Sequence, residues 1–113
     1  MNIAFKTNKM EKCCSNQRDG IREWGDKCAK KIRQRLVEFR AADTLADISF
    51  LPPPRCHPLG GDKSGLWAVD LVHPFRLLFS INQDPVPMLP NGEVDKEGVD
   101  SIMIWEVQDY HGR

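Results

Sequence analysis

The sequence has 113 residues, enough for a single hydrophobic core, and its 41% apolar and 28% charged residues are ordinary for a globular protein. No apolar stretch approaches the roughly 20 residues of a membrane-spanning helix, and the N-terminal residues lack the features of a signal peptide, so we expect a cytoplasmic protein without a membrane partner. The formal net charge is zero, with 16 Lys and Arg residues against 16 Asp and Glu, which argues against a general nucleic-acid binder.

The charges are nevertheless unevenly distributed along the chain. Residues 1–40 hold 11 Lys or Arg and 5 Asp or Glu, whereas residues 41–113 hold 5 and 11. Basic helices facing a polyanion would explain this pattern, and so would helices and a loop whose charges are simply solvated. Both explanations remain open from charge alone.

The four cysteines predict neither a metal site nor disulfides. Cys13 and Cys14 are adjacent, and Cys56 is adjacent to His57, whereas zinc ligands are normally separated by two to four residues. A disulfide framework needs an oxidising compartment, for which the chain shows no export signal. Cys28 falls on the apolar side of a predicted helix and is expected to behave as a small buried hydrophobic residue. No cofactor and no metal are expected.

The first third of the chain predicts one short strand and two helical segments. Residues 3–5 are an apolar run typical of a strand, and residues 10–24 have a weak helical period that Gly20 and Gly25 interrupt.

Residues 25–42 predict the clearest helix, which Asp26 is expected to cap. Its apolar residues recur at helical spacing and form a core-facing stripe: Cys28, Ile32, Leu36 and Phe39. Basic residues crowd the rest of its surface and are available to a partner: Lys30, Lys31, Arg33 and Arg35. Lys30 and Arg33 are the candidates for contacts with a nucleic-acid substrate.

The second half of the chain predicts a sheet. A short helical turn over residues 42–48 is followed by three consecutive prolines from position 52, which end any helix. Residues 66–72 and 75–81 then alternate as strands do, and the two residues between them indicate an antiparallel hairpin. The core-facing side chains are expected to be Trp67, Val69 and Leu71 in the first strand, and Phe75, Leu77, Phe79 and Ile81 in the second.

Residues 82–101 are rich in proline, glycine and acids, which is typical of a long loop that is either tolerated or used for binding. The final apolar run predicts a strand in which Met103, Trp105 and Val107 face one way.

The predicted elements make one domain over residues 1–113, with a helical part at about 8–48 and a sheet part at about 56–110. This order predicts an α+β fold, in which two N-terminal helices cover one face of a small, mainly antiparallel sheet.

Six polar side chains are predicted to lie outside the core, on or near the sheet: His57, Lys63, Arg76, Asp109, Tyr110 and His111. Arg76 lies between two core-facing neighbours, so it must point to the opposite face, where it is either solvated or binds an anion with its planar fork. A groove combining these residue types suits metal-independent cleavage of an RNA phosphodiester. Histidine transfers protons, Arg and Lys stabilise charge on phosphorus, and tyrosine stacks on a base.

Two segments carry a resemblance to a known family. The stretch RCHPLGGDKSGLWAVDLVHPFRLLFSI, residues 55–81, and the ending IWEVQDYHGR resemble the RelE/HigB superfamily of bacterial toxins, in particular the HigB or plasmid-maintenance killer-protein branch. The resemblance extends from about residue 25 to residue 113. It implies a RelE-like fold, a small antiparallel sheet with two N-terminal helices packed on one face.

The resemblance also implies a function and partners. Members of this family are toxins of type II toxin-antitoxin modules that inhibit growth as mRNA interferases, which are metal-independent endoribonucleases that cleave mRNA on the ribosome. A cognate antitoxin, usually a helix-turn-helix protein of the HigA type, holds them in check, and the pair binds its promoter DNA through the antitoxin complex.

Site residues follow from the same motifs. His57, Arg76, Tyr110 and His111 fall on positions that the family uses in or beside its active site, with Lys63 and Asp109 in supporting, substrate-binding roles. The resemblance implies that Arg76 holds the scissile phosphate, that His57 or His111 transfers protons, and that Tyr110 orients the substrate.

The chain departs from the family pattern at two positions. Gly60 and Ser80 stand where many active HigB-type toxins have basic residues, and Lys63 is the candidate substitute for the first. Loss of these cations favours an alternative function, in which the chain keeps the fold but acts by binding a protein, as gyrase poisons do, or is a degenerate member.

Overall fold

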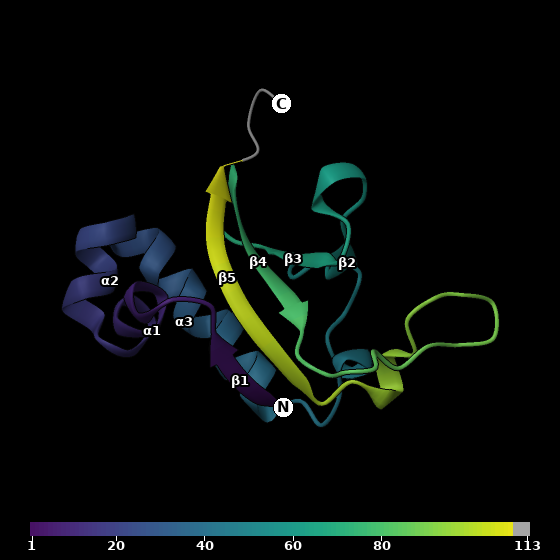
Figure 1. The fold of residues 1–113 in the computed structure, drawn as a ribbon. Coiled ribbons are helices and arrows are strands. Elements are labelled where there is room, and N and C mark those ends of the chain that lie inside the picture. The colour runs from purple at the N-terminus through teal and green to yellow at the C-terminus, as the bar shows by residue number, and fades with distance from the viewer. Residues whose placement is uncertain (110–113) are drawn as a thin grey trace.

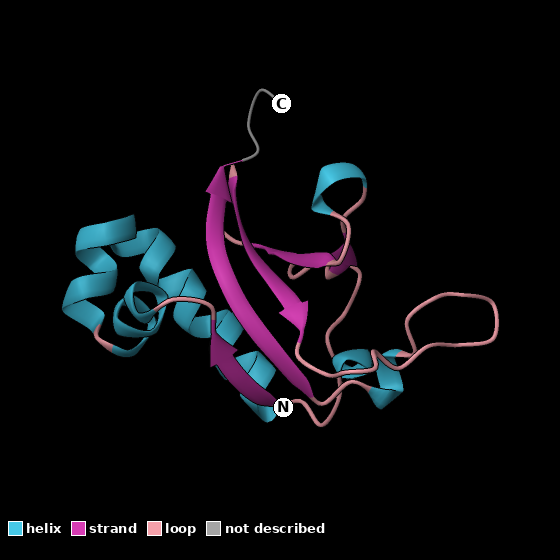
Figure 2. Ribbon diagram, viewed as in Figure 1, coloured by secondary structure: helices cyan, strands magenta, loops and turns pink. Residues whose placement is uncertain are grey.

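Three helices and a five-stranded mixed sheet make up residues 1–109, the part of the chain that this computed structural model describes (Figure 1). The helices are α1 (Asn8–Ser15), α2 (Gln17–Trp24) and α3 (Asp26–Ala41). The strands are β1 (Asn2–Phe5), β2 (His57–Pro58), β3 (Leu66–Asp70), β4 (Phe75–Ile81) and β5 (Ser101–Asp109). The helices lie together on one side of the sheet, so the α+β class is confirmed. Figure 2 shows α1, α2 and α3 together on one side of the strands, and short helical turns on the other side.

The strand order is β1-β5-β4-β3-β2, and every neighbouring pair is antiparallel except β1 and β5. The predicted hairpin of β3 and β4 is confirmed. The sheet is not wholly antiparallel, because β1 runs parallel to β5 with Ile3 opposite Ile102 and Phe5 opposite Ile104. No short turn joins these two strands, so the chain connection does not require them to be antiparallel.

The helical region divides into three helices rather than the predicted two. Asn16 ends α1 and begins α2, where its side-chain oxygen accepts a hydrogen bond from the Asp19 amide at 3.1 Å. Gly20 does not interrupt α2 but lies inside it, against α1. Gly25, with φ of +80°, is the N-cap of α3, so Asp26 is the first helical residue rather than the predicted cap.

The core lies between α3 and the sheet face that the helices cover. The predicted stripe of α3 is buried against apolar side chains of β3, β4 and β5, and Phe39 meets Phe79 edge to face with ring centroids 5.1 Å apart. Arg35 belongs to this buried side and not to the predicted solvent-exposed basic face. It is only 2% exposed, and donates hydrogen bonds to the carbonyl oxygens of Asp70 at 2.8 Å and Pro53 at 3.2 Å.

The facing of β5 differs from the prediction. A bulge inserts Trp105 between Ile104, which pairs with Phe79, and Glu106, which pairs with Leu78. Ile102 and Ile104 are therefore the buried residues before the bulge, and Met103 and Val107 lie on opposite faces.

Residues 83–100, called the arm below, are more ordered than a simple loop. Met88 and Val94 form a β-bridge, and a short 3-10 helix (Lys96–Gly98) leads back to β5. Figure 1 shows the arm projecting from the side of the sheet opposite the helices. The predicted helical turn after α3 is present as a 3-10 helix (Leu45–Asp47). Within residues 1–109, no helix is both long and apolar enough to cross a membrane.

Candidate functional site

A polar row crosses the sheet face that the helices leave uncovered. Asp70 of β3 lies opposite Arg76 of β4, and Arg76 lies opposite Gln108 of β5. Directly opposed residues point to the same face, and their neighbours Leu77 and Val107 point to the core. Strand pairing alone therefore brings three polar side chains from three strands into one row.

Arg76 is held in place by Gln108. Its Nε and one terminal nitrogen both donate to the Gln108 Oε1, at 2.9 and 2.7 Å, and the side chain is half-buried. Two hydrogen bonds to one acceptor define the plane of the guanidinium. This orientation lowers the entropic cost of presenting the arginine to a ligand.

Arg76 lines a cavity of about 440 Å³ at the C-terminal end of β5. The other lining residues come from the β2–β3 connection and from β5: Leu59, Gly60, Asp62, Lys63, Gln108 and Asp109. The cavity thus contains two cations, Lys63 and Arg76, and two carboxylates, Asp62 and Asp109. It offers positive groups for a phosphate together with carboxylates that orient those groups or accept protons.

A second arginine, Arg55, binds Asp70, the β3 member of the polar row. Arg55, with φ of +48°, binds both carboxylate oxygens of Asp70 at 2.7 and 2.8 Å. The bidentate pair holds the segment after the three prolines against β3.

His57 lies on β2, opposite Ala68, and its ring lines a neighbouring cavity rather than that of Arg76. Its Nδ1 is 2.6 Å from the carbonyl oxygen of Arg55. Because a carbonyl oxygen only accepts, Nδ1 carries the proton and Nε2 has the lone pair when the ring is neutral. His57 is thus arranged to accept a proton at Nε2. Leu59 lines both cavities.

The remaining predicted site residues are divided among three places. Lys63 and Asp109 line the cavity of Arg76. Lys30 and Arg33 lie on α3, which packs on the opposite face of the sheet, and they do not line that cavity. The predicted site residues Tyr110 and His111 follow Asp109 in the chain and lie outside the described residues.

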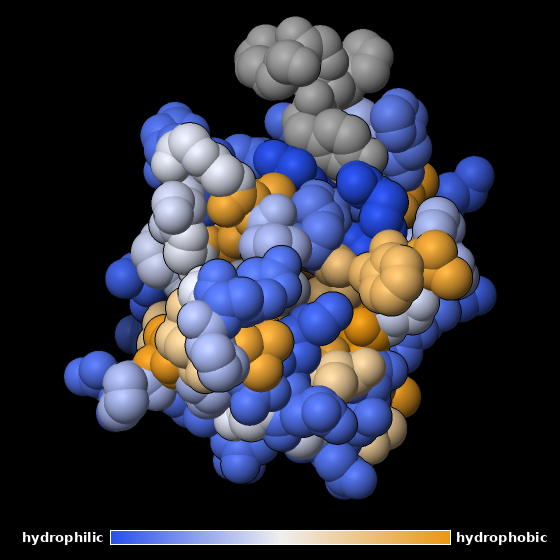
Figure 3. All heavy atoms as spheres, turned by 90° about the vertical axis from the view of Figure 1, so that its right-hand side faces the viewer, coloured by the Kyte–Doolittle hydropathy of each residue, from blue (hydrophilic) through white to orange (hydrophobic). Residues whose placement is uncertain are grey.

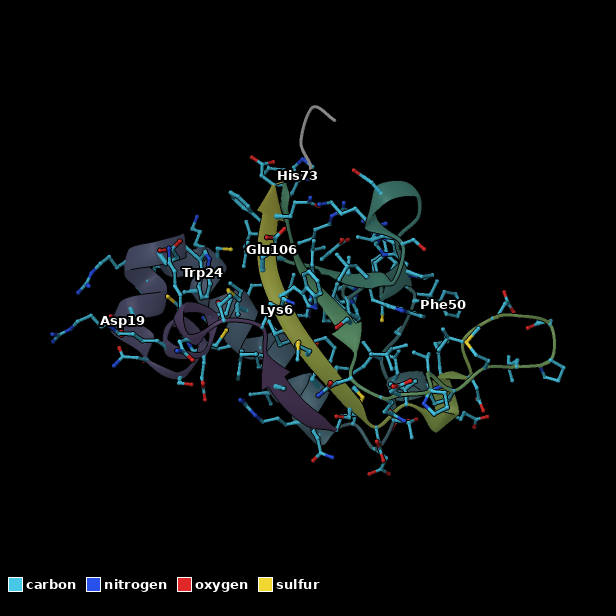
Figure 4. All side chains as sticks on the ribbon, in the orientation of Figure 1. Lys6, Asp19, Trp24, Phe50, His73 and Glu106 are labelled. Carbon is cyan, nitrogen blue, oxygen red and sulfur yellow. The ribbon has the colours of Figure 1, made fainter. Side chains whose placement is uncertain are left out.

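Three residues of this region were missed by sequence reasoning: Asp62, His73 and Gln108. Gln108 is the partner of Arg76 because β4 pairs with β5, and the sequence alone does not give this pairing. His73 is exposed in the turn between β3 and β4, and Figure 4 places it at the same end of the sheet as the C-terminal end of β5. The only sequence signal for these residues was their polarity next to predicted strands.

The two positions that depart from the family pattern have different surroundings. Gly60 is exposed and lines the cavity beside Lys63. Ser80 accepts a hydrogen bond from the Trp105 indole nitrogen at 2.9 Å, so it fixes the bulged residue of β5.

The four cysteines are free thiols, and burial raises the pKa of three of them, Cys14, Cys28 and Cys56. Burial, reinforced by the neighbouring Cys13, raises the pKa of Cys14 to about 12, against a smaller opposing effect of Arg40. Burial likewise raises the pKa of Cys56 to about 12, although Lys96 opposes the shift. Both thiols are therefore poor nucleophiles at neutral pH. Cys28 is buried as predicted.

Neither a scan against protein-family models nor a search of curated proteins found a match to this chain.

Proposed function

We propose that this chain is a toxin of a RelE/HigB-like toxin-antitoxin module that cleaves mRNA on the ribosome without a metal. The observation that carries the proposal is Arg76, oriented by Gln108 at a cavity that also contains Lys63. That cavity lies at the C-terminal end of β5. In the sequence, β5 is followed directly by Tyr110 and His111, which belong to the terminal motif that resembles the toxins.

The proposed reaction is attack of an RNA 2′-oxygen on the adjacent phosphorus with departure of the 5′-oxygen. A base removes the 2′-hydroxyl proton, and an acid protonates the leaving oxygen, which gives a 2′,3′-cyclic phosphate and a free 5′-hydroxyl. Arg76 and Lys63 stabilise the extra negative charge on the phosphoryl oxygens. His111 or His57 transfers protons in this step, and Tyr110 orients the substrate or stacks on a base.

In this proposal the protein acts in the cytoplasm and has three interactions. Its substrate is mRNA in the ribosome. Its inhibitor is a cognate helix-turn-helix antitoxin of the HigA type, and promoter DNA is contacted only through the complex with that antitoxin.

Induced expression in a bacterial host tests the proposal. Wild type should arrest growth and create new 5′ ends on translated mRNAs in phase with codons. Arg76→Ala and His111→Ala should lose both effects, because a charge-assisted hydrogen bond typically contributes about 1.5 to 3 kcal/mol and a proton-transfer group about 100- to 10,000-fold in rate.

Arg22→Ala is the matched control, because Arg22 is an exposed arginine on α2, which lies with the other helices on one side of the sheet, and it does not line the cavity (Figure 1). It should arrest growth and cleave as wild type does. Cleavage that survives Arg76→Ala and His111→Ala would refute the proposed roles of these residues.

A second function is favoured by the charge of the site. The cavity has as many carboxylates as cations, and neither Gly60 nor Ser80 adds a positive charge. These features suit a toxin that binds a protein, as a gyrase poison does, or a degenerate member. Growth arrest without mRNA cuts, preserved in both variants, would support this second function.

A further inference from the structure

A larger cavity lies on the same side of the molecule as the arm. Its volume is about 830 Å³, and it is bounded by residues 46–50, β2, the start of β3 and the arm. Its apolar lining includes Phe50, Leu66, Trp67, Leu89 and Val94. We call this cavity the arm groove. Figure 3 shows this side of the molecule, where apolar patches interrupt a mainly hydrophilic surface.

Large apolar side chains are exposed along the arm groove and the arm. Phe50 is 65% exposed, Leu89 is 40% exposed, and Met88, next to Leu89, is 53% exposed. Figure 4 places Phe50 on the side from which the arm projects. The Lys96 ammonium lies 5.7 Å from the centroid of the Phe50 ring, a cation–π contact. Exposed apolar groups rimmed by charges mark interaction sites, and aromatic residues dominate the binding energy of such sites.

The arm is held by its own hydrogen bonds. The Leu89 amide donates to the Glu93 carbonyl at 2.7 Å, and the Asp95 amide donates to the Pro87 carbonyl at 2.9 Å. At its base, the Gln83 side chain donates to the Gly98 carbonyl at 3.1 Å and accepts from the Asp100 amide at 2.9 Å. The groove wall is therefore preformed, and a ligand does not bear the entropic cost of ordering it.

The charges of the arm groove define the ligand it suits. Glu93, Asp95 and Glu97 lie along its arm side, and Lys96 is the cation among them. Because three carboxylates outnumber the one ammonium along the arm, this rim of the apolar groove is negative overall. A polyanion such as RNA is repelled here, whereas a segment with both apolar and cationic side chains is complementary.

We propose that the arm groove docks a segment of a partner protein that carries large apolar side chains flanked by Lys or Arg. One apolar side chain packs between Phe50 and Leu89, and the flanking cations meet Glu93 and Glu97. His57, a candidate residue of the nuclease site, also lines this groove. The docking proposal is tested separately from it, because the variants used below leave His57 and the residues of the Arg76 cavity unchanged.

Peptide selection on the full chain tests this proposal. A random linear peptide library displayed on phage is selected on immobilised wild type, with soluble Phe50→Ser protein in excess to remove phage that bind elsewhere. Enriched peptides should combine Leu, Ile, Phe or Trp with Lys or Arg. A fluorescent synthetic copy should bind Phe50→Ser and Leu89→Ser roughly tenfold or more weakly than wild type. Its binding should also weaken several-fold between about 50 and about 500 mM salt.

Val37→Ser is the matched control, because Val37 is an equally exposed apolar residue, at 63%, on α3. The peptide should bind this variant as it binds wild type, and thermal unfolding should show that all variants fold. Three outcomes would overturn the proposal: no enriched peptide, enrichment of acidic peptides, or equal binding to Phe50→Ser. Dimers in sedimentation equilibrium that Phe50→Ser dissociates would assign the groove to a second copy instead.

Discussion

Individual residues show how strongly the surroundings of a side chain decide its role. Arg35 and Arg33 belong to the same helix and the same basic run, yet Arg35 is buried and Arg33 is partly exposed. Arg35 joins α3 to two backbone carbonyls and pairs with Glu38 at 3.0 Å. It is thus a structural residue, whereas the oriented Arg76 is a candidate for ligand binding.

Arg35→Met should destabilise the fold by about 1 to 3 kcal/mol, because it removes the donors to two partly buried carbonyl oxygens while keeping most of the apolar contact. Arg33→Met, the control, should change stability by less than about 0.5 kcal/mol. Urea denaturation measures both. Equal stability of the two variants would show that the hydrogen bonds of Arg35 contribute little.

The raised pKa values of Cys14 and Cys56 predict a pH-dependent reactivity. With a pKa of about 12, Cys14 and Cys56 are almost fully protonated at pH 8, so iodoacetamide should modify them far more slowly in the folded chain than in urea.

The raised thiol pKa values also predict how the stability of the fold changes with pH. The thiols of the unfolded chain ionise near the ordinary cysteine pKa of 9.0, whereas those of the folded chain stay protonated to about 12. Because the unfolded state loses its protons first, stability should fall as pH rises from about 9 towards 12. Mass spectrometry and unfolding curves at several pH values check both effects. Rapid alkylation of the native chain at pH 8 would contradict them.

At the scale of elements, close packing of α1 against α2 depends on a missing side chain. A Cβ at Gly20 would lie 2.7 Å from the carbonyl oxygen of Cys13, which is backbone and cannot rotate away. The glycine that reads as a helix interruption in the sequence is therefore a packing residue inside a helix.

Gly20→Ala should destabilise the protein by about 1 to 3 kcal/mol, although alanine in a free helix is favoured over glycine by about 1 kcal/mol. Gly60→Ala is the control, because a Cβ there meets nothing within 4 Å. Thermal unfolding compares the two. A higher melting temperature for Gly20→Ala would mean that α1 and α2 move apart to accommodate the methyl group without loss of stability.

The whole molecule separates its two kinds of charge. The basic helices lie on one side of the sheet, and the acidic arm lies on the other, with the cavity of Arg76 at one end of the uncovered face. Under the proposed function, Lys30 and Arg33 attract RNA at long range rather than contact it at the cavity, which they do not line.

Lys63→Ala should lower the rate of RNA cleavage roughly tenfold or more, since it removes a cation from the cavity. The double change Lys30→Ala and Arg33→Ala should lower it by less than about threefold, and only at low salt. Cleavage assays on programmed ribosomes at two salt concentrations make the comparison. A larger loss from the double change would place the substrate on the helical side.

The sequence by itself determined the α+β class, the α3 stripe and the β3–β4 hairpin, because each depends on short-range periodicity and turn chemistry. It also identified Arg76, Lys63 and Asp109, which the structure brings to one cavity. Only the tertiary structure decided that Gln108 orients Arg76, that Arg35 is buried, that β1 runs parallel to β5, and that the arm borders a groove. These features depend on contacts between residues far apart in the chain and on the bulge at Trp105, which no local pattern specifies.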